Sequence, residues 1–318
     1  MQLGAENLFD KDKTHIYTIT TKGDELPTKE NIKTIFEEIS TKANAEDVIT
    51  VYLSGHGITW GGNQGDFYFL TSDATATSNE AYNDAVIRAK NTISTSEWVD
   101  WLKEIPALKQ VMIIDACGSG KAVDNLISER DIEPSQIKAI DRMKDRTGMY
   151  IISGCTADAV SYEASMYGQG LLTYSILQAF KGAALKEDKY VDIFTILEYA
   201  RETVPDLAEG IGGIQEPQLL IPKGGSFDIG LLEDEDKIAI PLASPKTVYV
   251  RSTLVNAEEF EDTLGLTELL NQELIAVSSK GKNSPLVYFD AAKFPNACKV
   301  SGGYTITDNG ISISMKLR

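Results

Sequence analysis

Histidine and cysteine are scarce in this chain of 318 residues, which contains two histidines and three cysteines. Three cysteines are too few, and an odd number, for a disulfide framework, and their spacing matches no zinc site. So little imidazole also argues against a transition-metal centre. We therefore predict no metal site and no cofactor, and each histidine and cysteine has to be interpreted from its own position.

Basic residues and long apolar runs are also lacking. The chain has 30 Lys and Arg against 47 Asp and Glu, which gives a net charge of −17. A nucleic-acid-binding protein needs a basic face, so nucleic acid is not an expected partner. There is no run of 18 apolar residues, so neither a transmembrane helix nor a membrane partner is predicted. Residues 1–6 lack the basic start and apolar stretch of a signal peptide, and we expect a cytoplasmic protein whose thiols stay reduced.

Apolar β-branched segments alternate with amphipathic segments through residue 222. This alternation is typical of an α/β fold with a mostly parallel sheet flanked by helices. Residues 57–65 and 75–91 are rich in glycine or polar residues and are predicted as a turn and a loop. Strands are predicted over residues 15–20, 47–54, 67–70, 111–116, 149–153 and 218–221, and helices over 27–43, 95–105, 171–180 and 193–204.

A composition change at residues 231–236, which are mostly acidic, predicts a linker between two domains. The expected boundaries are residues 1–230 for the large domain and 238–318 for a small α+β domain. In the small domain we predict strands over residues 247–250 and 286–289 and a helix over 258–277. The sequence Asp-Asn-Gly at 308–310 predicts a hairpin between residues 304–307 and 311–315.

Two apolar runs each end beside one reactive side chain. The first run leads to His56 and the second to Cys117. Buried parallel strands have such continuous apolar runs, and sites in open α/β sheets lie at the carboxyl ends of the strands. We therefore expect the imidazole and the thiol to lie close together. A buried thiol that only fills space is the alternative for Cys117. For Cys155, which follows the next strand end, and for Cys298 this packing role is the preferred interpretation.

A cysteine and a histidine placed in this way can hydrolyse an amide. His56 can take the proton of Cys117, because the thiolate is the effective nucleophile, and can then protonate the leaving amine. The small residues after Cys117 let backbone N–H groups approach a developing oxyanion, and each such donor typically lowers the barrier by about 3 kcal/mol. We predict His56 and Cys117 as catalytic residues, with Gly57 and Gly118 as oxyanion donors.

The two motifs resemble those of the caspase-like cysteine peptidases, especially bacterial caspase homologues and metacaspases. The matching segments are residues 54–57 (Ser-Gly-His-Gly) and 115–120 (Asp-Ala-Cys-Gly-Ser-Gly), and residues 152–163 are similar to the metacaspase segment that follows the next strand. The resemblance covers about residues 10–230. It implies a caspase–haemoglobinase fold, a caspase-like peptidase domain over residues 1–230, and peptide-bond hydrolysis through an acyl-enzyme.

The resemblance also implies substrate specificity. In metacaspase-like members an acidic residue two positions before the cysteine lines the primary pocket and selects Arg or Lys, and Asp115 occupies that position. A buried carboxylate pairs well with the guanidinium group of Arg. Asp158 and Glu163 are further candidates for substrate binding. The expected partner is therefore a protein or peptide with a basic P1 residue, while the alternative for Asp115 is that it caps a turn.

The resemblance also implies self-cleavage, which in this family occurs between the strand that carries the cysteine and the next strand. In this chain that connection is the polar segment over residues 118–146. Arg142, Lys144 and Arg146 are the candidate cleavage positions. The alternative is a charged loop in solvent with no such role.

The chain departs from the family pattern at its start, where only about a dozen residues precede residue 15. The resemblance then implies that the first strand is missing and that a partner segment or chain could complete the sheet. Some metacaspases need calcium, but no motif here singles out calcium ligands. A non-cleaving interaction module that binds peptides or partner proteins is the alternative function, and another thiol acyl-hydrolase such as a transpeptidase also stays open.

Overall fold

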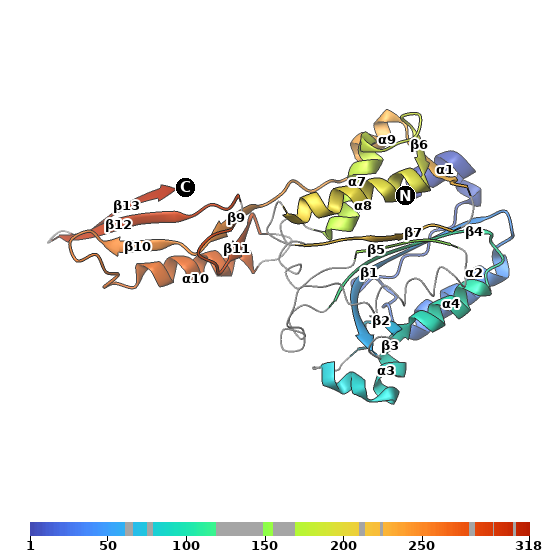
Figure 1. Ribbon diagram of the computed structural model, residues 1–318, viewed down its shortest axis with the longest axis horizontal. Helices are drawn as coiled ribbons and strands as arrows, with labels where there is room; N and C mark the ends of the chain where they lie inside the picture. The colour runs from blue at the N-terminus through green and yellow to red at the C-terminus, as the bar shows by residue number, and fades with distance from the viewer. Residues whose placement is uncertain are drawn as a thin grey trace. The chain divides into compact units, whose positions relative to one another are not determined.

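The computed structural model describes residues 1–60, 66–74, 79–118, 149–154, 169–209, 214–222, 225–279, 284–294, 296–307 and 310–318. The chain folds into two compact units (Figure 1). The first unit consists of Met1–Val160, Leu172–Pro205 and Ile214–Leu242. The second contains Ala243–Arg318 together with the segments Ser161–Leu171 and Asp206–Gly213.

A six-stranded sheet with the order β3-β2-β1-β4-β5-β7 forms the centre of the first unit. Its three inner strands β1, β4 and β5 are parallel, whereas the strands toward the two edges, β2, β3 and β7, are antiparallel to their neighbours. The predicted α/β class, with a mostly parallel central sheet flanked by helices, is confirmed. The strands are β1 (Val48–Trp60), β2 (Asp66–Leu70), β3 (Thr92–Ser94), β4 (Lys109–Gly118), β5 (Tyr150–Ser153) and β7 (Gln218–Leu220).

Helices cover both faces of this sheet (Figure 1). The helices α2 (Lys29–Lys42) and α4 (Thr95–Lys103) lie on one face, and α7 (Leu171–Gln178) and α8 (Ile193–Glu209) lie on the other. Successive side chains of a strand point to opposite faces, so β4 contributes to two separate cores. Its even-numbered residues Met112, Ile114 and Ala116 join the core under α2 and α4, and its odd-numbered residues Val111 and Ile113 join the core under α7 and α8.

The helix α4 begins at Thr95, as predicted, and two hydrogen bonds cap its start. The hydroxyl group of Ser94 accepts a hydrogen bond from the N–H of Glu97, and the Glu97 carboxylate accepts one from the N–H of Ser94. This reciprocal capping satisfies two backbone donors that a helix start otherwise leaves unpaired. The helix then turns Trp98 against Phe36 of α2, with 5.4 Å between the ring centroids. The capping box thus sets the position from which the largest side chain of this core packs.

Residues 15–20, predicted as a strand, are not a strand in the structure. The Tyr17 hydroxyl donates a hydrogen bond to Glu38 of α2 at 3.0 Å, and Ile19 packs on the core under the same helix. The alternation of apolar residues in this segment therefore reflects contact with a helix and not with a neighbouring strand. The prediction that residues 75–91 form a loop is also wrong where the structure describes them, because they include a 3₁₀ turn, η3 (Asn79–Asn83), and α3 (Ala85–Asn91), which Asp84 caps.

Smaller elements complete the first unit. The strands β6 (Tyr190–Asp192) and β8 (Asp228–Leu231) pair with each other, and α1 (Gln2–Phe9) packs close to β8. Residues 231–236, predicted as a linker, instead end β8 and begin α9 (Asp234–Ala239). Their acidic side chains occupy the first turn of α9, where negative charge stabilises a helix. Two further short turns are η1 (Lys11–Lys13) and the π-helical turn η4 (Ala179–Ala183).

The second unit has a three-stranded sheet with the order β10-β12-β13 and a separate parallel pair, β9 with β11. The predicted hairpin is present, because Thr307 pairs with Gly310, whose φ of 135° favours glycine. The predicted helix begins later than expected, at Leu266, because Asp262 accepts hydrogen bonds from the N–H groups of Leu266 and Thr267. The elements are β9 (Thr247–Val250), β10 (Thr253–Asn256), α10 (Leu266–Ser278), β11 (Leu286–Phe289), β12 (Val300–Thr307) and β13 (Gly310–Leu317).

None of the helices in the described ranges combines the length and the apolar composition that crossing a membrane requires.

Candidate functional site

The parallel pairing of β1 with β4 brings the two motifs together. In the register of this pair the Cα partner of His56 is Cys117, and the partner of Gly57 is Gly118. Strands paired in this way run about 5 Å apart, so the main chains of the histidine and the cysteine are direct neighbours. For Cys117 and Gly118 the structure describes the main chain alone. The two residues predicted as catalytic therefore occupy matched positions on adjacent strands.

The environment of His56 differs from the prediction in one respect. We expected a turn to begin at Gly57, but β1 continues to Trp60. From Gly57 onward the strand pairs with β2, where Phe69 is the partner of Gly57 and Asp66 that of Trp60. Gly57 consequently belongs to two ladders, one with β4 and one with β2. The glycine-rich composition of residues 57–65 suggested a turn, whereas Gly57 lies inside β1. Residues 61–65 lie outside the described residues.

The glycines of β1 make room for aromatic rings from β2. A Cβ atom on Gly57 would lie 2.5 Å from Cζ of Phe67, and one on Gly55 would lie 3.0 Å from Cζ of Phe69. Both phenylalanines belong to the core under α2 and α4. Close packing therefore requires glycine at position 57 independently of any role in catalysis.

Replacing Gly57 with alanine is expected to lower the free energy of unfolding by about 1–3 kcal/mol, the usual cost of overpacking a core. The added methyl group would overlap the Phe67 ring, which has to move. Urea denaturation followed by circular dichroism measures the change. A double variant with Phe67→Leu is the control, because a smaller side chain should restore part of the loss and give a favourable coupling energy. Unchanged stability of the single variant would contradict this packing role.

Asp115 lies on the face of the sheet that α7 covers. It is only 6% exposed, and its Oδ2 accepts hydrogen bonds from the N–H of Thr173, at 3.2 Å, and from the Thr173 hydroxyl group. Burial raises the pKa of Asp115, while these two hydrogen bonds act in the opposite direction. The other oxygen, Oδ1, is 3.7 Å from the place that a Cβ of Gly154 would occupy. One oxygen of the Asp115 carboxyl group is thus hydrogen-bonded to the start of α7, and the other faces the end of β5.

Tyr52 extends this arrangement toward the histidine. Its hydroxyl oxygen is 2.6 Å from Oγ1 of Thr173. Because the Thr173 hydroxyl group donates its single hydrogen to Asp115, Tyr52 is the donor in this contact. Residues 52 and 56 lie on the same face of β1, since side chains alternate along a strand. The hydrogen-bonded series Tyr52–Thr173–Asp115 therefore lies on the same face of the sheet as His56.

Sequence reasoning did not find three polar residues near this site. Tyr52 and Thr173 join the Asp115 network, and Gln215 is 2% exposed beside Gly154. In the part of the chain that the structure describes, Oε1 of Gln215 has no hydrogen-bond partner. The alternation along β1 could have indicated Tyr52. Thr173 and Gln215 follow only from how the later segments pack on the sheet.

Several predicted residues lie outside the described residues. They are Asp158 and Glu163, the three candidate cleavage positions Arg142, Lys144 and Arg146, and Cys155. Among the residues that are described, no group of three or more His, Cys, Asp or Glu side chains could hold a metal ion. Cys298, in the second unit, is a free and half-buried cysteine.

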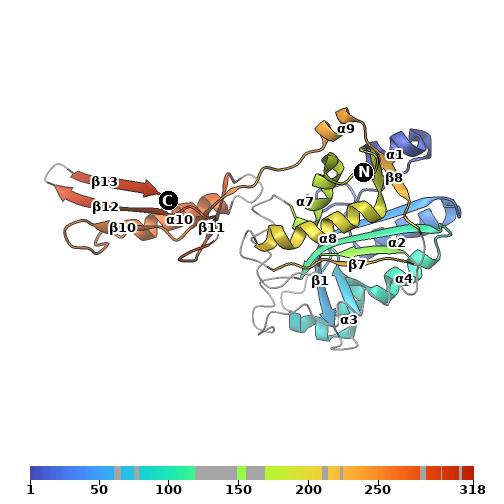
Figure 2. The same ribbon diagram turned by 45° about the horizontal axis from the view of Figure 1, so that its top comes forward.

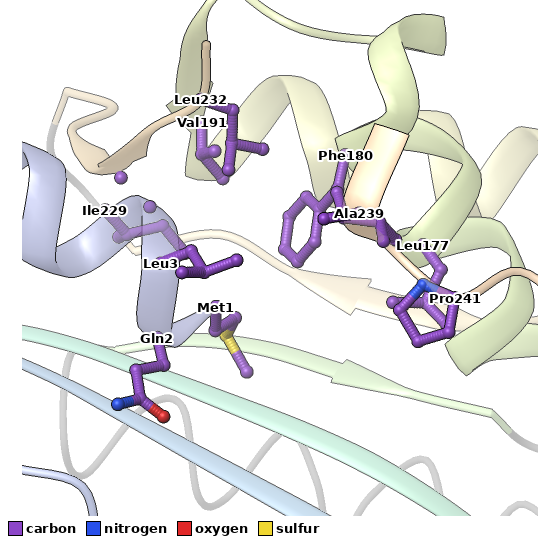
Figure 3. A pocket seen from close by; sticks show the side chains of 13 residues that line it. Met1, Gln2, Leu3, Leu177, Phe180, Val191, Ile229, Leu232, Ala239 and Pro241 are labelled. Atoms are coloured by element: carbon purple, nitrogen blue, oxygen red, sulfur yellow. The ribbon is translucent and has the colours of Figure 1, made fainter. Parts of the chain in front are cut away.

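An apolar cavity of about 240 Å³ lies elsewhere in the first unit (Figure 3). Residues of α1, α7, β6, β8 and α9 contribute to its wall, including Leu3, Phe180 and Leu232. None of the residues predicted for the site lines it, and its described lining contains no titratable side chain. The cavity is therefore separate from the site formed by β1, β4 and α7.

Comparison with known proteins identifies the class. The family model for the caspase domain matches residues 6–222. The chain therefore belongs to the caspase domain family of cysteine peptidases, which confirms the resemblance drawn from its motifs. The matched region includes His56, Asp115 and Cys117 and ends before β8.

Among solved structures, protein GSU0716 from Geobacter sulfurreducens is similar to this chain at 14% sequence identity and a TM-score of 0.38, over 72% of this chain and 80% of that one. None of the curated proteins compared with the chain matches it.

Proposed function

We propose that the protein is a cysteine endopeptidase that cleaves after Arg or Lys through a Cys117–His56 dyad. The observation that carries this proposal is the register of β1 with β4, in which the two residues are Cα partners. Membership of the caspase domain family supplies the reaction class. The substrates are then proteins or peptides with a basic P1 residue, and a cytoplasmic location is part of the proposal.

The proposed reaction has two halves, formation of a thioester on Cys117 and its hydrolysis, and His56 transfers a proton in both. His56 takes the proton of the Cys117 thiol, and the thiolate attacks the peptide carbonyl carbon. The N–H groups of Gly118 and Gly57 are the proposed donors to the oxygen that becomes negative. His56 then gives its proton to the leaving amine, which leaves a thioester on Cys117. Water, deprotonated by the same histidine, hydrolyses the thioester and restores the thiol.

Asp115 supports the proposed preference for a basic residue. Its carboxyl group is buried, and no Lys or Arg among the described residues forms an ion pair with it. A buried carboxylate without a counter-charge is costly, and the guanidinium or ammonium group of a substrate would supply the missing charge. Asp158 and Glu163 stay candidates for the same pocket.

Three fluorogenic peptides that differ only in a P1 residue of Arg, Lys or Asp test this proposal. The Arg and Lys peptides are expected to be cleaved with kcat/KM at least about 10²-fold above that of the Asp peptide, because like charges repel in a buried pocket. Cleavage of the Asp peptide alone would overturn the assignment of Asp115. A folded protein that cleaves none of the three would favour the peptide-binding module without hydrolysis.

Self-cleavage after Arg142, Lys144 or Arg146 belongs to the same proposal. The three basic residues fall within five positions in the connection between β4 and β5. A peptidase selective for basic residues would cut its own chain there when the connection reaches Cys117. A partner strand that completes the sheet is a further point that the resemblance suggests. Calcium dependence stays open, and the measurements on Cys117 variants described below can be made with and without calcium.

A further inference from the structure

Among the described residues, no strand pairs with the outer edge of β13 in the second unit. In the sheet β10-β12-β13, β13 pairs with β12 alone, and both Figure 1 and Figure 2 draw β13 as the last strand on that side of the sheet. We propose that this edge is an interface between two copies of the chain, which pair antiparallel along β13. The inference does not depend on the proposed peptidase function.

The backbone groups that face outward can be assigned from the ladder. Lys299 and Arg318 exchange two hydrogen bonds, N to O at 2.8 Å and 3.0 Å, so they form a hydrogen-bonded pair of the β12–β13 ladder. In an antiparallel ladder such pairs alternate with non-bonded pairs. The even-numbered residues of β13 therefore direct their N–H and C=O groups toward β12. The outward N–H and C=O groups belong to Ile311, Ile313, Met315 and Leu317.

The same four residues form an exposed apolar row. Their exposed fractions are 53% for Ile311, 47% for Ile313, 56% for Met315 and 58% for Leu317. Ile306, the ladder partner of Ile311 on β12, is 51% exposed and extends the row.

This apolar row lies on one face of the sheet, and the same face is buried on the neighbouring strand β12. Tyr304, the ladder partner of Ile313, is 1% exposed, and its hydroxyl group accepts a hydrogen bond from the N–H of Leu264 at 3.0 Å. On β10, Leu254 shares this face and is 4% exposed. The segment before α10 and the helix itself cover β10 and Tyr304. The apolar face continues onto β13, where the described residues provide no cover.

The strand has few of the features that usually protect an edge. Natural sheets place proline, charged residues, a bulge or a very short strand at an exposed edge to prevent pairing with another chain. β13 has eight residues without proline, and Lys316 is its only charged residue. An edge of this kind is suited to pairing.

Self-complementarity argues for a second copy as the occupant. When two β13 strands pair antiparallel about a two-fold axis at Ser314, Ile313 meets Met315 of the other copy, and Ile311 meets Leu317. All four outward-facing residues then form hydrogen-bonded pairs with one another, and the two apolar rows adjoin on one face. In the same register Lys316 meets Ser312, so no like charges meet across the interface.

The exposed area is sufficient for weak association. Five half-exposed aliphatic side chains leave on the order of 500 Å² on each copy, so two copies would bury about 1,000 Å², the lower limit for a specific interface. An isologous contact of this type closes on itself and stops at the dimer. We therefore expect a dimer that dissociates on dilution through the micromolar range.

Sedimentation equilibrium of the full chain from about 1 to 200 μM tests the proposal, with Cys117→Ala as the background so that self-cleavage does not alter the chain. A monomer–dimer equilibrium is expected. Ile313→Pro removes an outward N–H without removing a bond to β12, and should raise the dimer Kd at least about 10-fold. Urea denaturation of this variant checks that the second unit still folds. A chain that is monomeric at every concentration, or one that associates without limit, would overturn the inference.

A matched pair of variants at Ser312 tests the register. Ser312→Glu places a carboxylate opposite Lys316 of the other copy and should lower the dimer Kd about 2- to 10-fold, because two such pairs form per dimer. Ser312→Lys places like charges opposite each other and should raise the Kd by a similar factor. Opposite shifts support pairing along β13 in this register. Equal shifts, or none, would show that the association uses another surface.

Discussion

Replacing Cys117 with alanine is expected to lower kcat for an Arg- or Lys-containing amide by at least about 10³-fold, the usual loss when a nucleophile is removed. Without the thiol no thioester can form, and His56 has no proton to take. His56→Ala should cause a loss of similar size, because the remaining thiol is mostly protonated near neutral pH. The double variant should be no slower than either single one, since the two groups act as a unit. Initial rates with the fluorogenic peptides measure all three.

The controls for this prediction are the fold and the intact mass. Urea denaturation of Cys117→Ala should match that of the parent chain within about 1 kcal/mol, because a Cys to Ala change is small. Mass spectrometry should find chains cut after Arg142, Lys144 or Arg146 only when Cys117 is present. Retention of most activity by folded Cys117→Ala would refute the assigned nucleophile, and an identical intact mass for both proteins would reject self-cleavage alone.

Asp115→Asn is expected to weaken catalysis and strengthen the fold. The amide keeps the shape of the carboxyl group and can still accept the two hydrogen bonds from Thr173, but it cannot neutralise a basic side chain. The kcat/KM for Arg and Lys peptides should fall about 10²-fold or more, because a desolvated charge pair loses one partner. The free energy of unfolding at pH 7 should rise by about 1 kcal/mol, because the substitution removes a buried carboxyl group that has no counter-charge among the described residues.

The stability gain should depend on pH in a defined direction. Burial raises the pKa of Asp115, so the folded state holds this proton more tightly than the unfolded chain. The contribution of Asp115 to stability is therefore greatest below the ordinary aspartate pKa, falls as pH rises toward the raised pKa, and stays low above it. The difference between Asp115→Asn and wild type in urea denaturation should be small in acid and grow toward neutral pH.

Asp192 provides a matched control, because its pKa is shifted in the opposite direction to that of Asp115. It is also 6% exposed, and burial acts to raise its pKa, but hydrogen bonds from Ser226 and Thr195 outweigh that effect and leave the pKa lowered. Its carboxylate therefore adds stability above the ordinary aspartate pKa, and this stability is lost as pH falls. Asp192→Asn should destabilise the protein at pH 7. Equal effects of the two substitutions would show that the environments of the two carboxyl groups do not differ as described.

The sequence was sufficient for features that depend on local patterns. The start of α4 at Thr95 and the hairpin turn at Gly310 follow from hydrogen bonds and backbone angles within a few residues. The pairing of the His56 and Cys117 segments was also predictable. Two apolar runs, each ending at a reactive residue, indicate adjacent parallel strands.

The features that were not predictable depend on contacts between distant segments. Nothing local to residues 15–20 shows that their apolar side lies on α2 and not on a strand. The glycines at 55 and 57 suggest a turn until the rings of Phe67 and Phe69 occupy the space beside them. Thr173 enters the site only because α7 begins beside Asp115, 58 residues earlier in the chain.

The pairing of Gly57 with both β4 and β2 affects how His56 is held in place. Its neighbour His56 is carried by main chain that is bonded to one strand on one side and, a residue later, to a different strand on the other. The main chain of His56 has little freedom to move at this position, in contrast to that of a histidine on a surface loop. The position of His56 therefore depends on β1, β4 and β2 together. Substitutions in β2 that never contact a substrate can displace this histidine.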